Sequence, residues 1–203
     1  MKSSTEPLVT LSDRYVQAVA YVAEKHAKHT RKGTNTPYVC HLIGVSSLVL
    51  EADGDEEQAI AGLLHDVIED CNVTPAEITA RFGERVARIV VGCSDVMHSD
   101  EKADRDYGER KQTYLNGLEL APAETVLVSM ADKVHNARAI VTDLHESGAE
   151  VLDKFNGAPD KILTYYRECL RIGKAKGITT KLLIPLEIAV EEIAGYVPAT
   201  PVA

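Results

Sequence analysis

Apolar residues recur at intervals of three and four along most of the chain, which predicts helices rather than strands. Between residues 11 and 30, Tyr15, Val19, Val22 and Ala23 share one helical side, and Ser12 precedes them as a candidate N-cap. Comparable patterns predict further helices over residues 38–52, 55–69, 84–93, 108–117, 123–145, 159–176 and 181–195, and a short helix that starts at Thr74.

Glycine, proline and short polar residues separate these segments. Gly33 and Asn35 predict a loop over residues 31–36, and Gly83 separates two helices. The charged stretch 97–107 is the best candidate for a mobile loop. We therefore expect a flexible N-terminus (1–10), one all-α domain (11–196) built as a bundle of roughly eight to ten helices, and a flexible tail (197–203).

Charge and composition exclude several classes of protein. The 203 residues include 22 basic and 31 acidic side chains, a net charge of −9, which argues against non-specific binding to nucleic acid or anionic membranes. A polyphosphate ligand would need a local basic cluster. No apolar run reaches the roughly 20 residues that span a bilayer, and residues 1–10 lack the apolar region of a signal peptide.

The four cysteines predict a reducing compartment. Cys40, Cys71, Cys93 and Cys169 show no C-x-x-C spacing and no disulfide framework. We therefore expect a cytoplasmic protein. The oligomeric state, monomer or homodimer, is left open by the sequence.

A cluster of titratable residues interrupts the apolar segment around residue 65. His65 and Asp66 are followed by Glu69 and Asp70, so that each member of the first pair has a partner four residues later. Acidic side chains at a helix C-terminus oppose the helix dipole, and a bound cation would compensate them. A solvated acidic patch is the alternative, and the adjacent His-Asp pair makes a metal site about equally plausible.

Two further positions could complete such a site. Asp132 lies within an apolar helix, where a carboxylate is costly unless it is paired or metal-bound; taken alone, a salt bridge is the better explanation. His41 follows Pro37 on another helix, and a lone histidine there is more often a core residue. Together, His41, His65, Asp66 and Asp132 offer a mixed nitrogen and oxygen set that suits Mn²⁺ or Fe²⁺, with Zn²⁺ and Mg²⁺ as alternatives. The other histidines, at positions 26, 29, 98, 135 and 145, have no such supporting pattern and are interpreted as surface or core residues.

In this order, His41, His65-Asp66 and Asp132 resemble the HD superfamily of phosphohydrolases. The fuller set, with Arg31-Lys32-Gly33, residues 36–41, residues 82–86 and residues 131–138, resembles the hydrolase domain of Rel/Spo-type alarmone enzymes and the single-domain small alarmone hydrolases. The resemblance covers roughly residues 11–175 and implies a Mn²⁺-dependent release of the 3′-pyrophosphate of (p)ppGpp as pyrophosphate, leaving GDP or GTP.

The resemblance also assigns roles to individual residues. It implies that His41, His65, Asp66 and Asp132 hold the metal, and that Glu69 and Asp70 position or deprotonate the attacking water. Arg31 and Lys32 match residues that pack on the base, and Asn136 matches one that contacts the nucleoside. Arg105, Arg110 and Lys111 are candidates for the 5′-phosphates because Arg and Lys suit phosphate; a solvated loop is equally plausible for each.

The chain departs from the family pattern at three places. Leu42 replaces a proline after the first metal histidine, the loop before His41 is one residue longer, and Ala139 replaces a threonine near the base. The missing hydroxyl leaves a (p)ppApp hydrolase or another HD-type nucleotide phosphohydrolase open. A non-catalytic nucleotide sensor and a purely structural helical module are the remaining alternatives.

Overall fold

In the computed structural model, the residues described are 9–94, 107–154 and 158–197, and they form ten α-helices and one 3₁₀ helix without a β-strand. The helices are α1 (Asp13–Lys25), α2 (Val39–Glu51), α3 (Glu56–Leu64), α4 (Val67–Cys71), α5 (Pro75–Phe82), α6 (Glu84–Cys93), α7 (Tyr107–Leu120), α8 (Ala123–Ser147), η1 (Ala149–Lys154), α9 (Pro159–Ala175) and α10 (Thr180–Tyr196). The predicted all-α bundle is confirmed. The predicted mobile loop 97–107 lies almost entirely outside the described residues.

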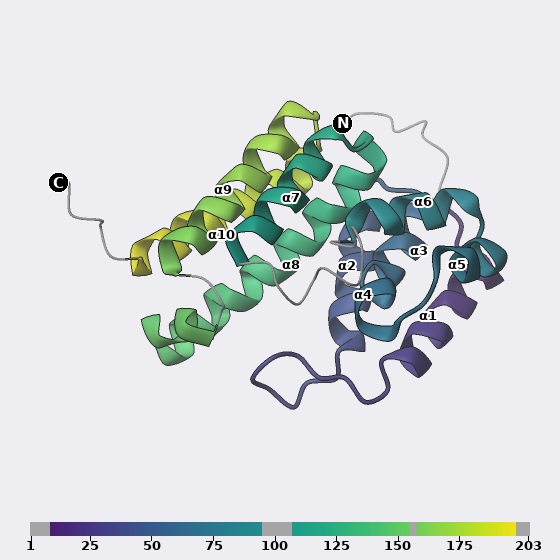
Figure 1. Ribbon diagram of the computed structural model, residues 1–203, viewed down its shortest axis with the longest axis horizontal. Coiled ribbons are helices and arrows are strands. Elements are labelled where there is room, and N and C mark those ends of the chain that lie inside the picture. The colour runs from purple at the N-terminus through teal and green to yellow at the C-terminus, as the bar shows by residue number, and fades with distance from the viewer. Residues whose placement is uncertain (1–8, 95–106, 155–157, 198–203) are drawn as a thin grey trace, which may run out of the picture.

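The long helix α8 forms the centre of the bundle (Figure 1). It packs against α2, α3 and α6 on one side of the molecule and against α9, α10 and η1 on the other. Figure 1 shows α1 to α6 gathered at one end and α9 and α10 at the other, with α8 passing between them. Residues from both ends therefore meet along this single helix.

Local sequence explains most of the helix boundaries. Ser12 caps α1 by accepting a hydrogen bond from the Arg14 backbone N–H, as the pattern predicts. Asp55 and Gln58 form a reciprocal capping box at the start of α3. Thr74 caps α5, but Glu77 does not complete a capping box, because its carboxylate accepts from the Tyr21 hydroxyl at 2.8 Å.

The prediction of one helix over residues 55–69 is wrong. The sequence pattern predicts one continuous helix over residues 55–69, but α3 ends at Leu64 and α4 begins at Val67. His65 and Asp66 lie in the turn between them. Neighbouring residues of a continuous α-helix point about 100° apart, whereas this turn brings His65 Nε2 within 2.9 Å of Asp66 Oδ2. The break therefore directs two consecutive side chains at one place.

The loop before α2 is closed by backbone hydrogen bonds. The Arg31 N–H donates to the Thr36 carbonyl, and the Tyr38 N–H donates to the His29 carbonyl, both at 2.9 Å. Gly33 takes a φ of +77°, which the turn requires. The predicted loop over residues 31–36 is thus confirmed. Within the described residues, no helix is long and apolar enough to cross a membrane.

Candidate active site

Three side chains from three helical segments converge at the centre of the molecule. His41 comes from α2, His65 from the turn after α3, and Asp132 from α8. Ligand atoms from these three residues all lie within 4.8 Å of one another, and all three residues are buried. Nε2 of His41 is 3.2 Å and Nε2 of His65 is 3.6 Å from Oδ1 of Asp132.

Asp66 stands beside this group. Its Oδ2 lies 2.9 Å from Nε2 of His65 and 3.7 Å from Nε2 of His41. The structure therefore brings together all four residues that the sequence predicts as metal ligands. Two imidazole nitrogens and two carboxylates at these separations are a donor set that suits a divalent cation.

The ionisation state of Asp66 and Asp132 also suits the binding of a cation. Burial opposes ionisation of Asp132, but the adjacent Lys133 ammonium and the two histidines hold its pKa well below the usual range. Burial likewise opposes ionisation of Asp66, yet mainly His65 lowers its pKa to about 2. Both carboxyl groups are therefore negatively charged near neutral pH.

The side chain of His65 tests whether a divalent cation fits this centre. Its Nε2 is buried and, although close to Asp66, makes no well-aligned hydrogen bond. Burial disfavours a charged imidazole there, but the carboxylates of Asp66 and Asp132 outweigh it and raise the pKa of His65. A divalent cation would replace that proton and use the Nε2 lone pair, so the residues present fit a metal ion.

The rings of His41 and His65 are oriented by contacts at their Nδ1 atoms. Nδ1 of His65 lies 2.8 Å from the Gly62 carbonyl oxygen, to which it donates. Nδ1 of His41 lies 3.0 Å from Nδ1 of His135. A proton on Nδ1 of each ring leaves Nε2 free, which is how metal-binding histidines are commonly held.

His135 contacts the His/Asp centre, although the sequence predicts only a surface or core residue at this position. It lies on α8, and a Cβ at Gly44 on α2 would come within 2.4 Å of its imidazole ring. Gly44 therefore provides the space in which His135 supports His41. The available signal is spacing: Gly44 follows His41 by three residues and so lies on the same side of α2.

Two other neighbours hold the carboxylates. Tyr38 donates its hydroxyl proton to Oδ2 of Asp66 at 2.7 Å. Lys133 donates to Oδ2 of Asp132 at 2.6 Å, and Asn136 donates its side-chain amide to Oδ1 of the same residue at 2.5 Å. These contacts fix the orientation of both acids and partly neutralise them.

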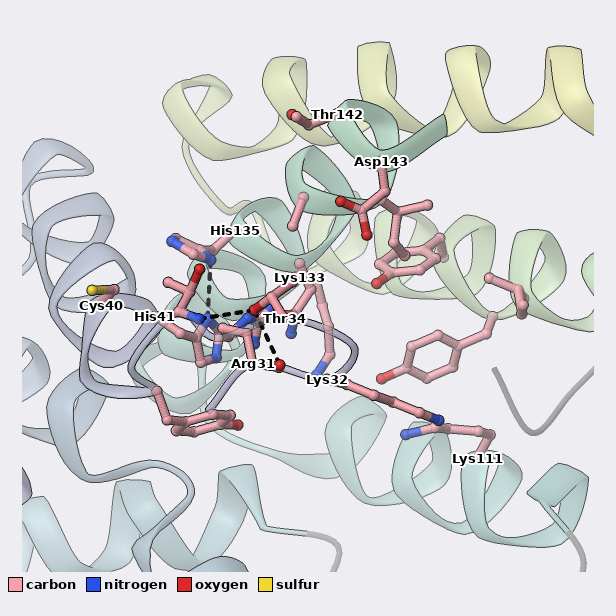
Figure 2. Close-up of a pocket in the computed structure, with 18 residues that line it drawn as sticks. Arg31, Lys32, Thr34, Cys40, His41, Lys111, Lys133, His135, Thr142 and Asp143 are labelled. Atoms are coloured by element: carbon pink, nitrogen blue, oxygen red, sulfur yellow. Dashed lines mark hydrogen bonds between the residues drawn. The ribbon is translucent and has the colours of Figure 1, made fainter. Parts of the chain in front are cut away.

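A cavity of about 620 Å³ opens beside this centre, within the range of small-molecule sites. Figure 2 shows His41 and His135 near one end of it and Lys111 near the other, with Arg31 and Lys32 between them. Among the described residues, four cations line it: Arg31, Lys32, Lys111 and Lys133. This is the local basic cluster that a polyphosphate ligand needs in a protein whose net charge is −9.

The predicted substrate-binding residues are only partly brought together. Arg31, Lys32, Lys111 and Asn136 line the cavity, and Nη2 of Arg31 donates to Oδ1 of Asn136 at 2.7 Å. Arg110 does not line it. Arg105 lies outside the described residues.

The carboxyl groups of Glu69 and Asp70 lie next to the His/Asp centre and not in the cavity. Glu69 and Asp70 belong to the short helix α4 that follows Asp66, and neither lines the cavity. Although Asp70 is exposed, partial desolvation and the nearby carboxylates of Asp66 and Glu69 raise its pKa to about 6. Such a carboxyl exchanges protons readily close to neutral pH.

The fold and this His/Asp centre define the class of protein. A family model described as HD domain matches residues 18–155, and the chain belongs to the HD domain family. The predicted family resemblance is thus confirmed.

Among curated relatives, a Danio rerio protein named guanosine-3′,5′-bis(diphosphate) 3′-pyrophosphohydrolase MESH1 is 40% identical over 130 residues, which cover 61% of this chain and 67% of that protein. An Aquifex aeolicus protein named guanosine-3′,5′-bis(diphosphate) 3′-pyrophosphohydrolase is 35% identical over 127 residues. That match covers 61% of this chain but only 17% of the Aquifex protein, so the chain corresponds to a small part of it.

Solved structures share the arrangement of helices. A metazoan ortholog of SpoT, described as hydrolysing ppGpp, superposes with a TM-score of 0.74 at 25% identity, covering 91% of this chain and 98% of that one. A protein of Listeria monocytogenes EGD-e superposes with a TM-score of 0.64 at 23% identity, covering 81% and 100%, and shows the fold alone.

Proposed function

We propose that this chain hydrolyses the 3′-pyrophosphate of an alarmone nucleotide, (p)ppGpp, to GDP or GTP and pyrophosphate, with Mn²⁺ as the metal. One observation carries the proposal: a buried His/Asp centre suited to a divalent ion borders a cavity lined by four cations. The relatives named for this reaction add support. Cytoplasmic location is part of the proposal and is consistent with four free cysteines.

The metal ligands would be His41, His65, Asp66 and Asp132. When bound, a divalent ion lowers the pKa of a bound water and polarises a phosphoryl oxygen. Mn²⁺ is favoured over softer ions because two of the four donors are carboxylates. Lys133 and Asn136 keep Asp132 in place, and Tyr38 does the same for Asp66.

Glu69 and Asp70 would position the attacking water and take up its proton. Their helix begins directly after Asp66, so the two carboxyl groups are carried by the same short segment as a metal ligand. A carboxylate that orients a water molecule beside a metal is a suitable general base.

The cavity would hold the nucleotide. Arg31 and Lys32 present cationic groups that can pack on the face of a base, and Asn136 borders the same space. Lys111 is the described candidate for the 5′-phosphates, with Arg105 and Arg110 as further candidates from the sequence. Charge complementarity with a highly anionic nucleotide supports this assignment.

Two residues that line the cavity, Ala139 and Asp143, bear on whether guanine or adenine is the preferred base. Ala139 supplies no hydroxyl there, while the Asp143 side chain faces into the cavity (Figure 2). A carboxylate can accept hydrogen bonds from the N1–H and amino group of guanine, which adenine does not present in that arrangement. This favours the guanine alarmone over (p)ppApp.

A substrate panel tests the proposal. Metal-free protein is supplied with Mn²⁺ and with ppGpp, pppGpp, ppApp, pppApp and ordinary nucleotides, and the products are separated. We expect pyrophosphate plus GDP or GTP from the guanine alarmones, and no turnover by Asp66→Ala. Hydrolysis of ordinary nucleotides alone, or binding without turnover, would replace the proposal by a general nucleotidase or by a nucleotide sensor.

A further inference from the structure

A second group of side chains that could hold a metal ion lies outside the His/Asp centre. His26 is the C-cap of α1, His29 follows three residues later, and Cys71 is the last residue of α4. One ligand atom from each residue lies within 4.8 Å of those of the other two. The tertiary packing of α1 against α4 brings them together.

The contacts within this group centre on His26, which is only 2% exposed. Its Nδ1 lies 3.0 Å from Nδ1 of His29, and its Nε2 lies 3.4 Å from Sγ of Cys71. Each nitrogen of this buried ring therefore faces another potential metal ligand, and an ion shared by all three residues would take one of the two nitrogens. Sγ of Cys71 also lies 3.6 Å from the Lys25 carbonyl oxygen, which keeps the thiol next to the end of α1.

The imidazole of His26 is in the state that a metal requires. Burial, followed by the neighbouring His29, lowers the pKa of His26 to about 4. The ring is therefore neutral at physiological pH and carries a lone pair, whereas burial raises the pKa of the Cys71 thiol, so a metal ion has to displace the thiol proton on coordination.

We propose that His26, His29 and Cys71 form a second metal site, which binds Zn²⁺ and leaves the fourth tetrahedral position to water. Zinc is bound by imidazole nitrogens and thiolate sulfurs, and zinc sites with three protein ligands keep the fourth position for water. Thiolate disfavours Mn²⁺, whereas the carboxylates of the first centre suit it. The two sites thus differ in the metal that each prefers.

The second site is connected to the first through Tyr38. The rings of His26 and Tyr38 stack with centroids 5.1 Å apart and an interplanar angle of 16°. The Tyr38 hydroxyl donates to Asp66, as described above. Zinc bound at His26 therefore steadies the ring on which Tyr38 packs, and Tyr38 in turn orients an acid of the catalytic centre.

The alternative is a hydrogen-bonded packing cluster that never binds metal, and Co²⁺ distinguishes the two. Cobalt replaces zinc, and its bond to a thiolate produces a charge-transfer absorption in the near ultraviolet that histidine and carboxylate ligands do not produce. The reduced, metal-free full chain is titrated with Co²⁺, and Zn²⁺ or Mn²⁺ is then added. We expect the thiolate band to appear, to vanish with Zn²⁺ and to persist with Mn²⁺.

Matched variants assign the band to this site. Cys71→Ser abolishes it, His29→Gln weakens or abolishes it, and Cys40→Ser, which removes an exposed thiol elsewhere, keeps it. Asp132→Asn also keeps it, because the first centre holds no thiolate. Absence of the band from the parent protein, its survival in Cys71→Ser, or its loss in Cys40→Ser overturns the proposal.

Thermal unfolding separates loss of the site from loss of the fold. In an Asp132→Asn background, added Zn²⁺ raises the melting temperature, and adding Cys71→Ser or His29→Gln removes that rise. His29 is only half-buried, so its variant is expected to fold. An equal rise with and without these ligands contradicts the proposal. Neither readout depends on alarmone hydrolysis, so a failure here leaves the proposed activity untouched.

Discussion

Nδ1 of His41 lies 3.0 Å from Nδ1 of His135, and this contact joins α2 to α8 directly behind the metal-type centre. The outer imidazole determines which nitrogen of the inner one is free. A side chain on α8 thereby influences the geometry of a candidate ligand on α2.

We expect His135→Gln to lower the affinity for Mn²⁺ by about 10- to 100-fold, the usual effect of removing a partner that orients a ligand. Isothermal titration of metal-free protein measures it. His145→Gln is the matched control, because His145 lies on the same helix but is exposed and pairs with Glu192 at 3.2 Å. Equal metal affinity in the two variants would show that the contact with His41 has no orienting role.

Lys133→Met should destabilise the metal-free protein by about 3–5 kcal/mol, because it leaves the carboxylate of Asp132 buried without its ammonium partner. The two side chains are only 12% and 10% exposed. Denaturant unfolding gives the free energy, and added Mn²⁺ should restore part of it by neutralising Asp132. Lys174→Met, which breaks an exposed pair with Glu187, should cost no more than about 1 kcal/mol. Similar losses in both variants would contradict this account.

Glu69→Ala should retain metal and lose turnover by about 10²- to 10⁴-fold, because a general base contributes that much. Metal binding and kcat are measured on the same preparation, with Glu146→Ala, an exposed acid on α8, as the control. If Glu69→Ala hydrolyses ppGpp as fast as the parent, the water-activating role is assigned to the wrong residue.

Arg31→Ala should raise KM for ppGpp by about 3- to 30-fold and change kcat little, as expected for the loss of a cation–π contact with the base. The guanidinium is positioned for it by its hydrogen bond to Asn136 and lies 5.7 Å from the Tyr38 ring centroid. Lys28→Ala removes an exposed cation outside the cavity and serves as control. An unchanged KM would remove Arg31 from the base site.

The cysteines should differ widely in reactivity. Burial raises the pKa of the Cys169 thiol to about 11, so at pH 8 only about one molecule in a thousand carries the reactive thiolate. Cys40 is exposed and borders the cavity. Alkylation followed by mass spectrometry should therefore modify Cys40 well before Cys169, and bound nucleotide should slow it. Rapid labelling of Cys169 in folded protein would contradict the burial described here.

Much of the fold is predictable because each helix carries its own apolar pattern and its own capping residues. Ser12, Asp55 and Thr74 mark the starts of helices in the sequence and cap them in the structure. The four candidate metal ligands are also recognisable in the sequence, because histidine and aspartate within apolar helices are unusual. Helix periodicity does not show that these four residues converge. That expectation comes only from the family resemblance.

The features that escaped prediction depend on contacts between distant segments. No glycine or proline marks the break at His65 and Asp66, and the periodic pattern continues across it. His135 gains its role only when α8 lies against Gly44 of α2. Likewise, nothing in the spacing of His26, His29 and Cys71 reveals that α1 and α4 place them together.

The turn that separates α3 from α4 means that the consecutive ligands His65 and Asp66 are attached to different helices. A helix of five residues is too short to persist by itself, so α4 depends on what anchors each of its ends. Asp66 is one such anchor, and the positions of Glu69 and Asp70 depend on it because they belong to the same short helix. On the proposed assignment, a cation held by Asp66 would therefore also restrain the short helix that carries Glu69 and Asp70, so that ion binding and the placement of these two acids would be coupled.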